Sequence, residues 1–254
     1  MSFDVDASAY GRSMGRFAEA LAVRFADAAG VTPGQRALDV GCGTGALTAE
    51  LVARLGPEAV SAVDPSAPFV EAARVRLPGA DVRRASAELL PFPDGGFDVT
   101  LAQLVVHFMT DPVAGLREMG RVTRPGGVVA ACVWDHAGGR GPLTVFWQAV
   151  RSLDPDAHDE SGLAGAREEH LAELFTAAGL RDVRSSVLTV RTRFASFDQW
   201  WEPYTLGVGP AGDHVQRLDA AGRAALRDRC ASLLGERWPV EVPASAWTAI
   251  GRTR

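Results

Sequence analysis

Short apolar runs alternate with amphipathic stretches from about residue 36 to residue 134. Runs of this kind, bounded by glycine and proline, are typical of buried strands joined by helices. The predicted strands are 36–40, 59–63, 81–83, 97–102 and 127–133, and the predicted helices between them are 46–55, 68–77 and 112–122. This alternation predicts an α/β fold with a doubly wound, mostly parallel sheet.

Two later stretches, 183–194 and 240–252, alternate between apolar and polar residues, and Pro243 interrupts the second. They are predicted to close the sheet as an antiparallel pair, which brings the strands to seven. Near the N-terminus, Phe17, Leu21 and Phe25 repeat every four residues, which predicts a helix with one apolar face. The predicted divisions are a helical arm at 1–32 and one domain at 33–254, with helical cap insertions at about 138–166 and 195–238.

A glycine-rich segment at 38–45, Leu-Asp-Val-Gly-Cys-Gly-Thr-Gly, lies where the first strand turns into a helix. Glycines there let the backbone approach a ligand that a Cβ would exclude. Asp64 ends the next strand, at the sequence separation where an acid accepts hydrogen bonds from ribose hydroxyls. Together they predict a nucleoside ligand. Because Gly41, Gly43 and Ala46 also fit the dinucleotide-binding spacing, a nicotinamide-dependent oxidoreductase is an alternative.

Four segments in order resemble the class I S-adenosylmethionine (SAM)-dependent methyltransferases, within a match that covers about 33–135. They are the first motif at 38–45, the ribose-binding acid at 63–66, the adenine segment at 85–92, and at 124–127 the Arg-Pro-Gly-Gly turn of the ubiquinone-biosynthesis-like small-molecule subgroup. The resemblance implies a Rossmann-like sheet with helices on both faces. It also implies transfer of a methyl group from SAM to an oxygen, nitrogen or carbon of a small molecule, with S-adenosylhomocysteine as product.

The resemblance also implies roles for individual residues around the methionine part and the sugar. Backbone groups of the loop from Gly41 through Cys42 to Gly43 would face the methionine part, and Asp39 would contact its ammonium. Asp64 would hold the ribose. Cys42 is expected to be a small residue that fits this loop rather than a nucleophile.

For the adenine and the reacting end, the implied residues come from later segments. Pro65 would pack on the adenine face, and the Ala87 amide would pair with a ring nitrogen. Ser86 stands where many members of the family have Asp, so the acceptor for the adenine amino group is shorter and neutral. Gln103, at the end of the fourth strand, would line the site near the sulfonium.

The arm and one histidine complete the expected site. Tyr10 and the Met-Gly-Arg segment at 14–16 are similar to an arm motif of the subgroup, which implies that the arm closes over SAM with Arg16 near its carboxylate. His107 lies four residues beyond Gln103, and a histidine there could take a proton from a hydroxyl acceptor. We therefore expect His107 to be catalytic, with helix-start or pocket-wall packing as the alternative.

Composition limits partners and location. The chain has 254 residues, 47% hydrophobic and 22% charged, and a formal net charge of −5, which disfavours nucleic acid. No apolar run approaches the roughly 20 residues that cross a bilayer, and the first residues do not resemble a signal peptide, so a cytoplasmic protein without membrane contact is expected. The histidines and acids lack compact ligand spacing, so no metal is expected. A monomer and a homodimer both stay open.

Two functions compete with methyl transfer. The first is the nicotinamide-dependent oxidoreductase, against which stand the adenine segment and the absence of lysine, which rules out a Tyr-x-x-x-Lys pair. The second is a SAM-binding protein without catalysis. The sequence does not identify the methyl acceptor, because the cap that would select it matches no known motif.

Overall fold

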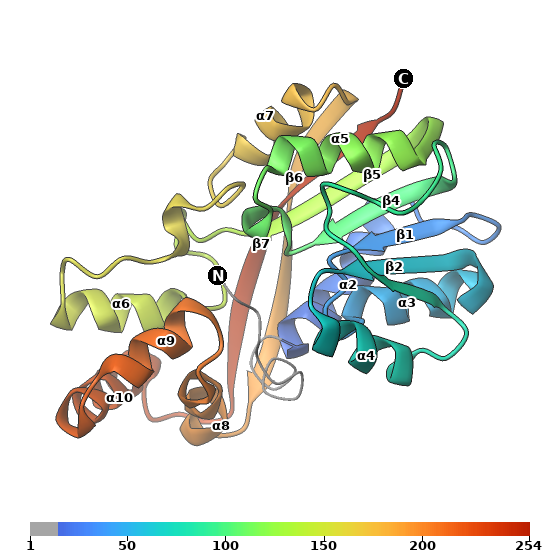
Figure 1. The fold of residues 1–254 in the computed structure, drawn as a ribbon. Helices are drawn as coiled ribbons and strands as arrows, with labels where there is room; N and C mark the ends of the chain where they lie inside the picture. The colour runs from blue at the N-terminus through green and yellow to red at the C-terminus, as the bar shows by residue number, and fades with distance from the viewer. Residues whose placement is uncertain (1–14) are drawn as a thin grey trace.

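The computed structural model describes residues 15–254, and Figure 1 shows one sheet of seven described strands between layers of helices. The strands are β1 (Ala37–Val40), β2 (Val60–Asp64), β3 (Asp81–Arg84), β4 (Phe97–Gln103), β5 (Thr123–Trp134), β6 (Arg181–Phe194) and β7 (Val240–Arg252). Their order is β3-β2-β1-β4-β5-β7-β6, and β7 runs antiparallel to both of its neighbours. The predicted mostly parallel sheet with a closing antiparallel pair is confirmed.

The central strands follow directly from their apolar sequence. Every residue of β1 and β2 is buried, as expected for parallel strands that helices cover on both faces. The strand order reverses between β1 and β4, both of which pair with parallel neighbours. In open α/β sheets, a crevice forms at such a reversal, beyond the carboxyl ends of the strands.

Helices cover the two faces of the parallel part of the sheet. One face carries α2 (Arg16–Ala28), α3 (Ala46–Leu55) and α4 (Ala67–Arg76), and the other carries α5 (Pro112–Val122) and α7 (His170–Ala177). In α2, the side chains of Phe17, Leu21 and Phe25 are all buried, which confirms the predicted apolar face.

Two predicted boundaries are wrong. Strand β5 begins at Thr123 rather than at residue 127, because Thr123 pairs with Phe97 and Val128 pairs with Val99. The residues between them form a bulge, where a Cβ at Gly127 would lie 2.8 Å from the Asp98 carbonyl. Strand β6 begins at Arg181 rather than at residue 183, because Arg181 pairs with Arg252 of β7.

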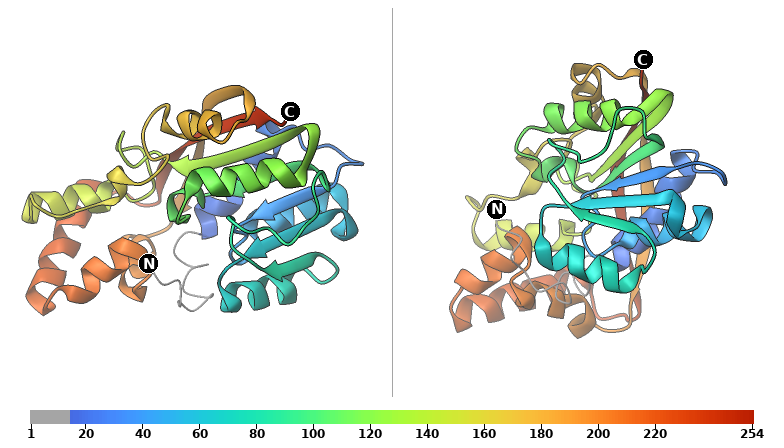
Figure 2. Two further views of the ribbon diagram at one scale, coloured as in Figure 1. Left: turned by 45° about the horizontal axis from the view of Figure 1, so that its top comes forward. Right: turned by 45° about the vertical axis from the view of Figure 1, so that its right-hand side comes forward.

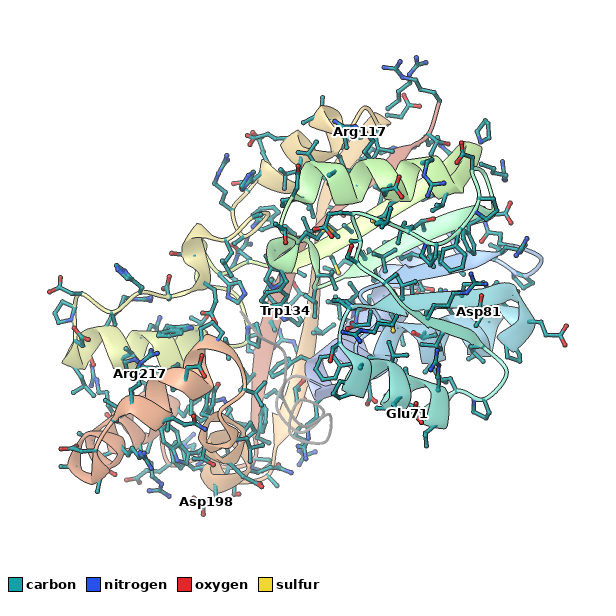
Figure 3. The ribbon with its side chains drawn as sticks, viewed as in Figure 1. Glu71, Asp81, Arg117, Trp134, Asp198 and Arg217 are labelled. Carbon is teal, nitrogen blue, oxygen red and sulfur yellow. The ribbon has the colours of Figure 1, made fainter. Side chains whose placement is uncertain are left out.

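The two predicted cap insertions form helices beyond the end of β5, at one end of the sheet (Figures 1 and 2). They are α6 (Thr144–Leu153), α8 (Phe197–Trp201), α9 (Gly209–Arg217) and α10 (Ala220–Leu234). Aromatic rings hold them together: Phe146 stacks on Tyr204 with ring centroids 4.6 Å apart, and Trp200 is buried. Trp134, at the end of β5, lies where the sheet meets the cap (Figure 3).

Candidate functional site

A cavity of about 810 Å³ opens at the carboxyl ends of β1, β2 and β4. Its volume lies within the range of pockets that bind small molecules and cofactors. Ten residues predicted for the site line it: Asp39, Gly41, Cys42, Gly43, Asp64, Pro65, Ser86, Ala87, Gln103 and His107. The fold therefore brings together segments that are up to 68 residues apart in sequence, from Asp39 to His107.

The glycine loop needs its glycines for both conformation and space. Gly41, Gly43 and Gly45 have φ values of 73°, 53° and 87°, in the left-handed region that other residues rarely adopt. A Cβ at Gly41 would lie 2.4 Å from a Val105 side-chain carbon, so Gly41 permits close contact with the chain after β4. The glycine loop therefore lies against the segment after β4, and Val105 of that segment also lines the cavity.

Asp64 is fixed by two backbone amides. Its Oδ2 accepts a hydrogen bond from the Gly43 amide at 2.9 Å, and its Oδ1 accepts one from the Ser66 amide at 2.8 Å. Burial raises the pKa of Asp64, and the two amides oppose this shift. The carboxyl group is held in one orientation at the cavity wall, and each oxygen keeps a lone pair for a ligand hydroxyl.

Asp39 lies deeper, at the end of β1, and is 1% exposed. Its Oδ2 accepts a hydrogen bond of 2.7 Å from the Thr48 hydroxyl, whereas its buried Oδ1 has no hydrogen-bond partner among the described residues. Burial raises the pKa of Asp39 to about 7, despite the Thr48 hydrogen bond. A buried carboxyl oxygen without a donor is costly, so this position suits a ligand that brings a donor or a positive charge.

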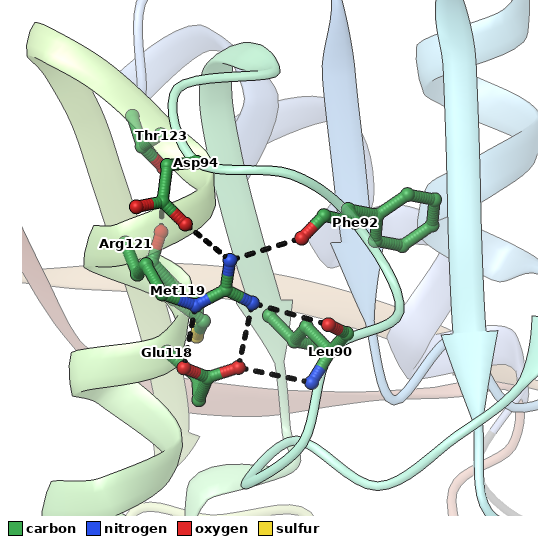
Figure 4. A network of polar contacts seen from close by, with 7 residues as sticks. All are labelled: Leu90, Phe92, Asp94, Glu118, Met119, Arg121 and Thr123. Carbon is green, nitrogen blue, oxygen red and sulfur yellow. Dashed lines mark hydrogen bonds and ion pairs between the residues drawn. The ribbon is translucent and has the colours of Figure 1, made fainter.

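The predicted adenine segment is held by a clamp that sequence reasoning missed (Figure 4). Arg121 of α5 donates hydrogen bonds to the backbone carbonyls of Leu90 and Phe92, at 3.1 and 2.9 Å, and to Asp94 at 2.6 Å. Glu118 accepts two hydrogen bonds from Arg121 and one of 3.1 Å from the Leu90 amide. The Arg121 guanidinium holds the pKa of Glu118 below its ordinary value.

The sequence indicates only part of this clamp. The spacing of Glu118 and Arg121 by three residues on one helix suggests an ion pair but does not reveal the loop that the pair contacts. The clamp holds residues 90–94, directly after the segment whose Ser86 and Ala87 line the cavity.

The end of β4 connects the cavity to the arm. Gln103 donates a hydrogen bond from Nε2 to the Ala18 carbonyl of α2 at 3.0 Å, and its buried Oε1 has no partner among residues 15–254. The next residue, Leu104, has a φ of 62°, an unfavourable conformation for a branched side chain. Strain of this kind at the edge of a cavity is common in functional sites.

Of the two arm residues of the expected site, only Arg16 belongs to the described part of the chain. Arg16 is exposed, does not line the cavity, and sets its guanidinium 5.9 Å from the centre of the Phe194 ring. Tyr10 lies outside the described residues. Gly15, which belongs to the predicted arm motif, and Ala18, which the sequence did not indicate, do line the cavity, so the start of α2 forms part of its wall.

His107 separates the large cavity from a smaller space of about 80 Å³, here named the inner chamber. The inner chamber is lined by His107, Trp134, His136, Glu160, Tyr204 and Val208, among others. Burial, with a smaller effect of His136, lowers the pKa of His107 to about 3, and burial lowers the pKa of His136 to about 4. Both imidazoles are therefore neutral near pH 7.

The burial of Glu160, another residue of this region, is not predicted by the sequence pattern. It belongs to an acidic stretch, and residues of this type are usually exposed. Its side chain is nevertheless buried, and burial raises its pKa to about 7. Within the described part of the chain, no group of three histidine, cysteine or acidic side chains is arranged to hold a metal ion. None of the described helices is long and apolar enough to cross a membrane.

Comparison with known proteins places the chain in a family. A methyltransferase-domain family model matches residues 38–131. A demethylmenaquinone methyltransferase from a Mycobacterium species is 36% identical over 178 residues, which are 64% of this chain and 74% of that protein. The chloroplast 2-methyl-6-phytyl-1,4-hydroquinone methyltransferase 2 of rice is 35% identical over 152 residues, 59% of this chain but only 40% of that protein.

The solved structures agree on the fold. A putative methyltransferase from an antibiotic biosynthesis pathway of Anabaena variabilis superposes with a TM-score of 0.61 at 15% identity, over 92% of this chain and 96% of that chain. The glycine loop, the buried Asp39 and Asp64 line one cavity, and the sequence relatives are methyltransferases. The chain belongs to the class I SAM-dependent methyltransferases.

Proposed function

We propose that this protein transfers a methyl group from SAM to a small molecule that carries a planar, quinol-like ring. The observation that carries the proposal is the cavity at the carboxyl ends of β1, β2 and β4, with Asp39 and Asp64 fixed in its wall. The names of the mycobacterial and rice relatives, both of which refer to quinone-type rings, support this class of acceptor.

The residues present fit the cofactor. The unpartnered Oδ1 of Asp39 suits an ammonium group, and the lone pairs of Asp64 suit a pair of ribose hydroxyls. Ala87 and the exposed Ser86 provide backbone and hydroxyl groups where an adenine edge would lie, and Pro65 provides an apolar face. When bound, SAM supplies an electrophilic methyl group on a positively charged sulfur.

The protein's part in the reaction is mainly positioning. Alignment of a nucleophile with an electrophile can supply several kcal/mol of the barrier, roughly 7–11 in favourable model systems. His107 lines both the cavity and the inner chamber, so it faces the region between cofactor and acceptor. As a neutral imidazole it can accept a hydrogen bond from an acceptor hydroxyl. Because burial lowers the pKa of His107, its imidazole holds a transferred proton only weakly.

The proposal is tested by methyl transfer itself. We expect radiolabelled methyl from SAM to appear in at least one member of a panel of hydroquinones and naphthoquinols, with S-adenosylhomocysteine formed in equal amount. His107→Ala should reduce turnover with hydroxyl acceptors and leave SAM binding intact. Binding of SAM without methyl transfer to any phenol, quinol, amine or activated carbon acceptor would favour the non-catalytic alternative.

Four further expectations belong to this proposal. The protein acts in the cytoplasm, on a small molecule and without nucleic acid, and residues 1–32 close over the cofactor as an arm. The cap selects the acceptor. The methyltransferase names of the relatives give no support to a nicotinamide-dependent oxidoreductase.

A further inference from the structure

The inner chamber contains a buried carboxyl group whose role the proposed function leaves open. Glu160 is 6% exposed, and its Oε2 is buried without a hydrogen-bond partner among the described residues. The Trp147 indole N–H lies near enough to lower the pKa of Glu160, but it makes no hydrogen bond of ordinary geometry and is itself unpartnered in the described part of the chain. A buried acceptor without a donor costs about 1–3 kcal/mol, more when charged.

A second unpartnered group lies in the same chamber. The Nδ1 atom of His107 is buried and has no partner within residues 15–254, and both His107 and Glu160 line the chamber. The remaining walls are flat or apolar, formed by Trp134, Tyr204 and Val208 among others. No arginine is among the described lining residues. The chamber therefore offers a carboxyl oxygen of Glu160 and the Nδ1 atom of His107, which accepts or donates a hydrogen bond according to its tautomer. It has no cationic side chain among its described lining residues to receive an anion.

The size of the chamber limits what can enter it. A cavity of about 150 Å³ is known to hold benzene in another protein, whereas this chamber measures about 80 Å³. It can hold only one edge of a ring. Because Leu104, His107 and Phe108 line both spaces, the rest of the molecule would extend into the large cavity, where methyl transfer is proposed.

Resting on the proposed function, we propose that Glu160 anchors the methyl acceptor by accepting a hydrogen bond from a hydroxyl on its ring. A hydroxyl is the donor that a quinol-like ring would bring to this position. An ammonium group would pair with the Glu160 carboxylate through its charge, so benzylammonium is included in the test as the competing donor. The same groups disfavour acceptors that end in a carboxylate or a phosphate, since such an anion would meet Glu160 with no opposing cation.

The test compares two rings of similar size, phenol and fluorobenzene, by ligand-observed NMR titration of the full-length protein saturated with S-adenosylhomocysteine. Because burial raises the pKa of Glu160 to about 7, the titration is run at about pH 8.5, where its carboxyl group is ionised. Phenol should then bind wild-type protein roughly tenfold more tightly than fluorobenzene, the effect of one hydrogen bond to a charged group. In Glu160→Leu the two rings should bind within about twofold of each other, because the hydrogen-bond acceptor at residue 160 is removed. Glu202→Leu, a cap carboxylate that faces solvent, is the matched control and should keep the phenol preference.

Folding and cofactor binding are checked in the same samples. If Glu160→Leu loses its cooperative thermal transition, Glu160→Gln takes its place, and it should retain part of the phenol preference because it keeps one acceptor oxygen. Absence of a phenol preference in wild-type protein, or persistence of that preference in Glu160→Leu, would overturn the proposed role of Glu160. Tighter binding of benzylammonium than of phenol would overturn the assignment of a neutral hydroxyl. Failure of S-adenosylhomocysteine to bind wild-type protein would refute the proposed function instead.

Discussion

The side chain of Gln103 donates a hydrogen bond of 3.0 Å to the backbone carbonyl of Ala18, and so joins the end of β4 to helix α2 across 85 residues of sequence. Both residues line the large cavity. The bond therefore couples the position of the arm helix to the floor of the site, and its loss should affect ligand binding as well as stability.

We expect Gln103→Met to lower the free energy of unfolding by about 1–2 kcal/mol, because it removes the buried hydrogen bond between the Gln103 side chain and the Ala18 carbonyl. Affinity for S-adenosylhomocysteine should fall as well, by roughly tenfold. Urea unfolding and calorimetry measure the two effects. Gln148→Met, at an exposed position of α6, should change neither. Unchanged affinity in a destabilised Gln103→Met protein would show that the bond is structural only.

The pKa of Asp39 predicts a pH dependence of stability. Burial raises this pKa to about 7 in the folded protein, from an ordinary value of 3.8. Between these two values the folded protein binds more protons than the unfolded chain, so the contribution of Asp39 to stability is lost as pH rises from about 4 to about 7. Asp39→Asn should flatten this part of the curve, as measured by urea unfolding at several pH values.

The same group predicts proton release on cofactor binding. An ammonium beside Asp39 favours the ionised carboxylate, so binding near pH 6 should release a proton and affinity should rise toward pH 7.5. Calorimetric titrations in buffers of different ionisation enthalpy count the protons. Equal proton counts for wild-type protein and Asp39→Asn would contradict the assigned role of Asp39.

The clamp of Arg121 and Glu118 predicts an effect on the adenine segment. Arg121→Lys keeps the charge but cannot reach the Leu90 and Phe92 carbonyls and Glu118 together, because lysine lacks the planar fork. We expect stability to fall by about 1–2 kcal/mol and S-adenosylhomocysteine to bind roughly fivefold to tenfold more weakly. Arg117→Lys, at an exposed position of the same helix, is the control. Equal affinities for the two variants would show that the clamp does not shape the site.

Gly41→Ala tests the close approach of the glycine loop. The new Cβ would lie 2.4 Å from Val105, so we expect a loss of stability of about 2–4 kcal/mol and no measurable cofactor binding. Gly34→Ala is a matched control, because Gly34 also has a positive φ, 89°, but open space around its Cβ position. It should cost only the backbone strain, about 1–2 kcal/mol. Thermal unfolding and calorimetry of both variants separate the clash from the strain.

The sequence predicted the parts of this protein that depend on local pattern. Strands such as β1 and β2 are short, mainly apolar runs, and the glycine loop and Asp64 lie at fixed positions relative to them. These features specify the sheet and the cofactor-binding edge. By contrast, the bulge of β5 depends on pairing between Phe97 and Thr123 across two strands, which no single segment reveals.

The part of the site proposed for the methyl acceptor could not be predicted from the sequence, because it is built from contacts between distant segments. Glu160 lies in an acidic stretch whose neighbours face solvent, and only the packing of the cap buries it beside His107. The bond from Gln103 to Ala18 and the clamp from Arg121 to Leu90 are long-range in the same sense. Gln103 and Glu160 have side chains of types that are usually solvated, so their burial in the folded chain is the signal that identifies them.

The central claim is that the edge formed by Asp39, the glycine loop and Asp64 binds a sulfonium nucleoside. Calorimetric titration of the folded protein with S-adenosylhomocysteine, and separately with NADH, tests it most directly. The account predicts one saturable site for S-adenosylhomocysteine, weakened roughly tenfold or more in Asp64→Ala, and no heat from NADH. Saturable binding of NADH by protein that ignores both SAM and S-adenosylhomocysteine would contradict it.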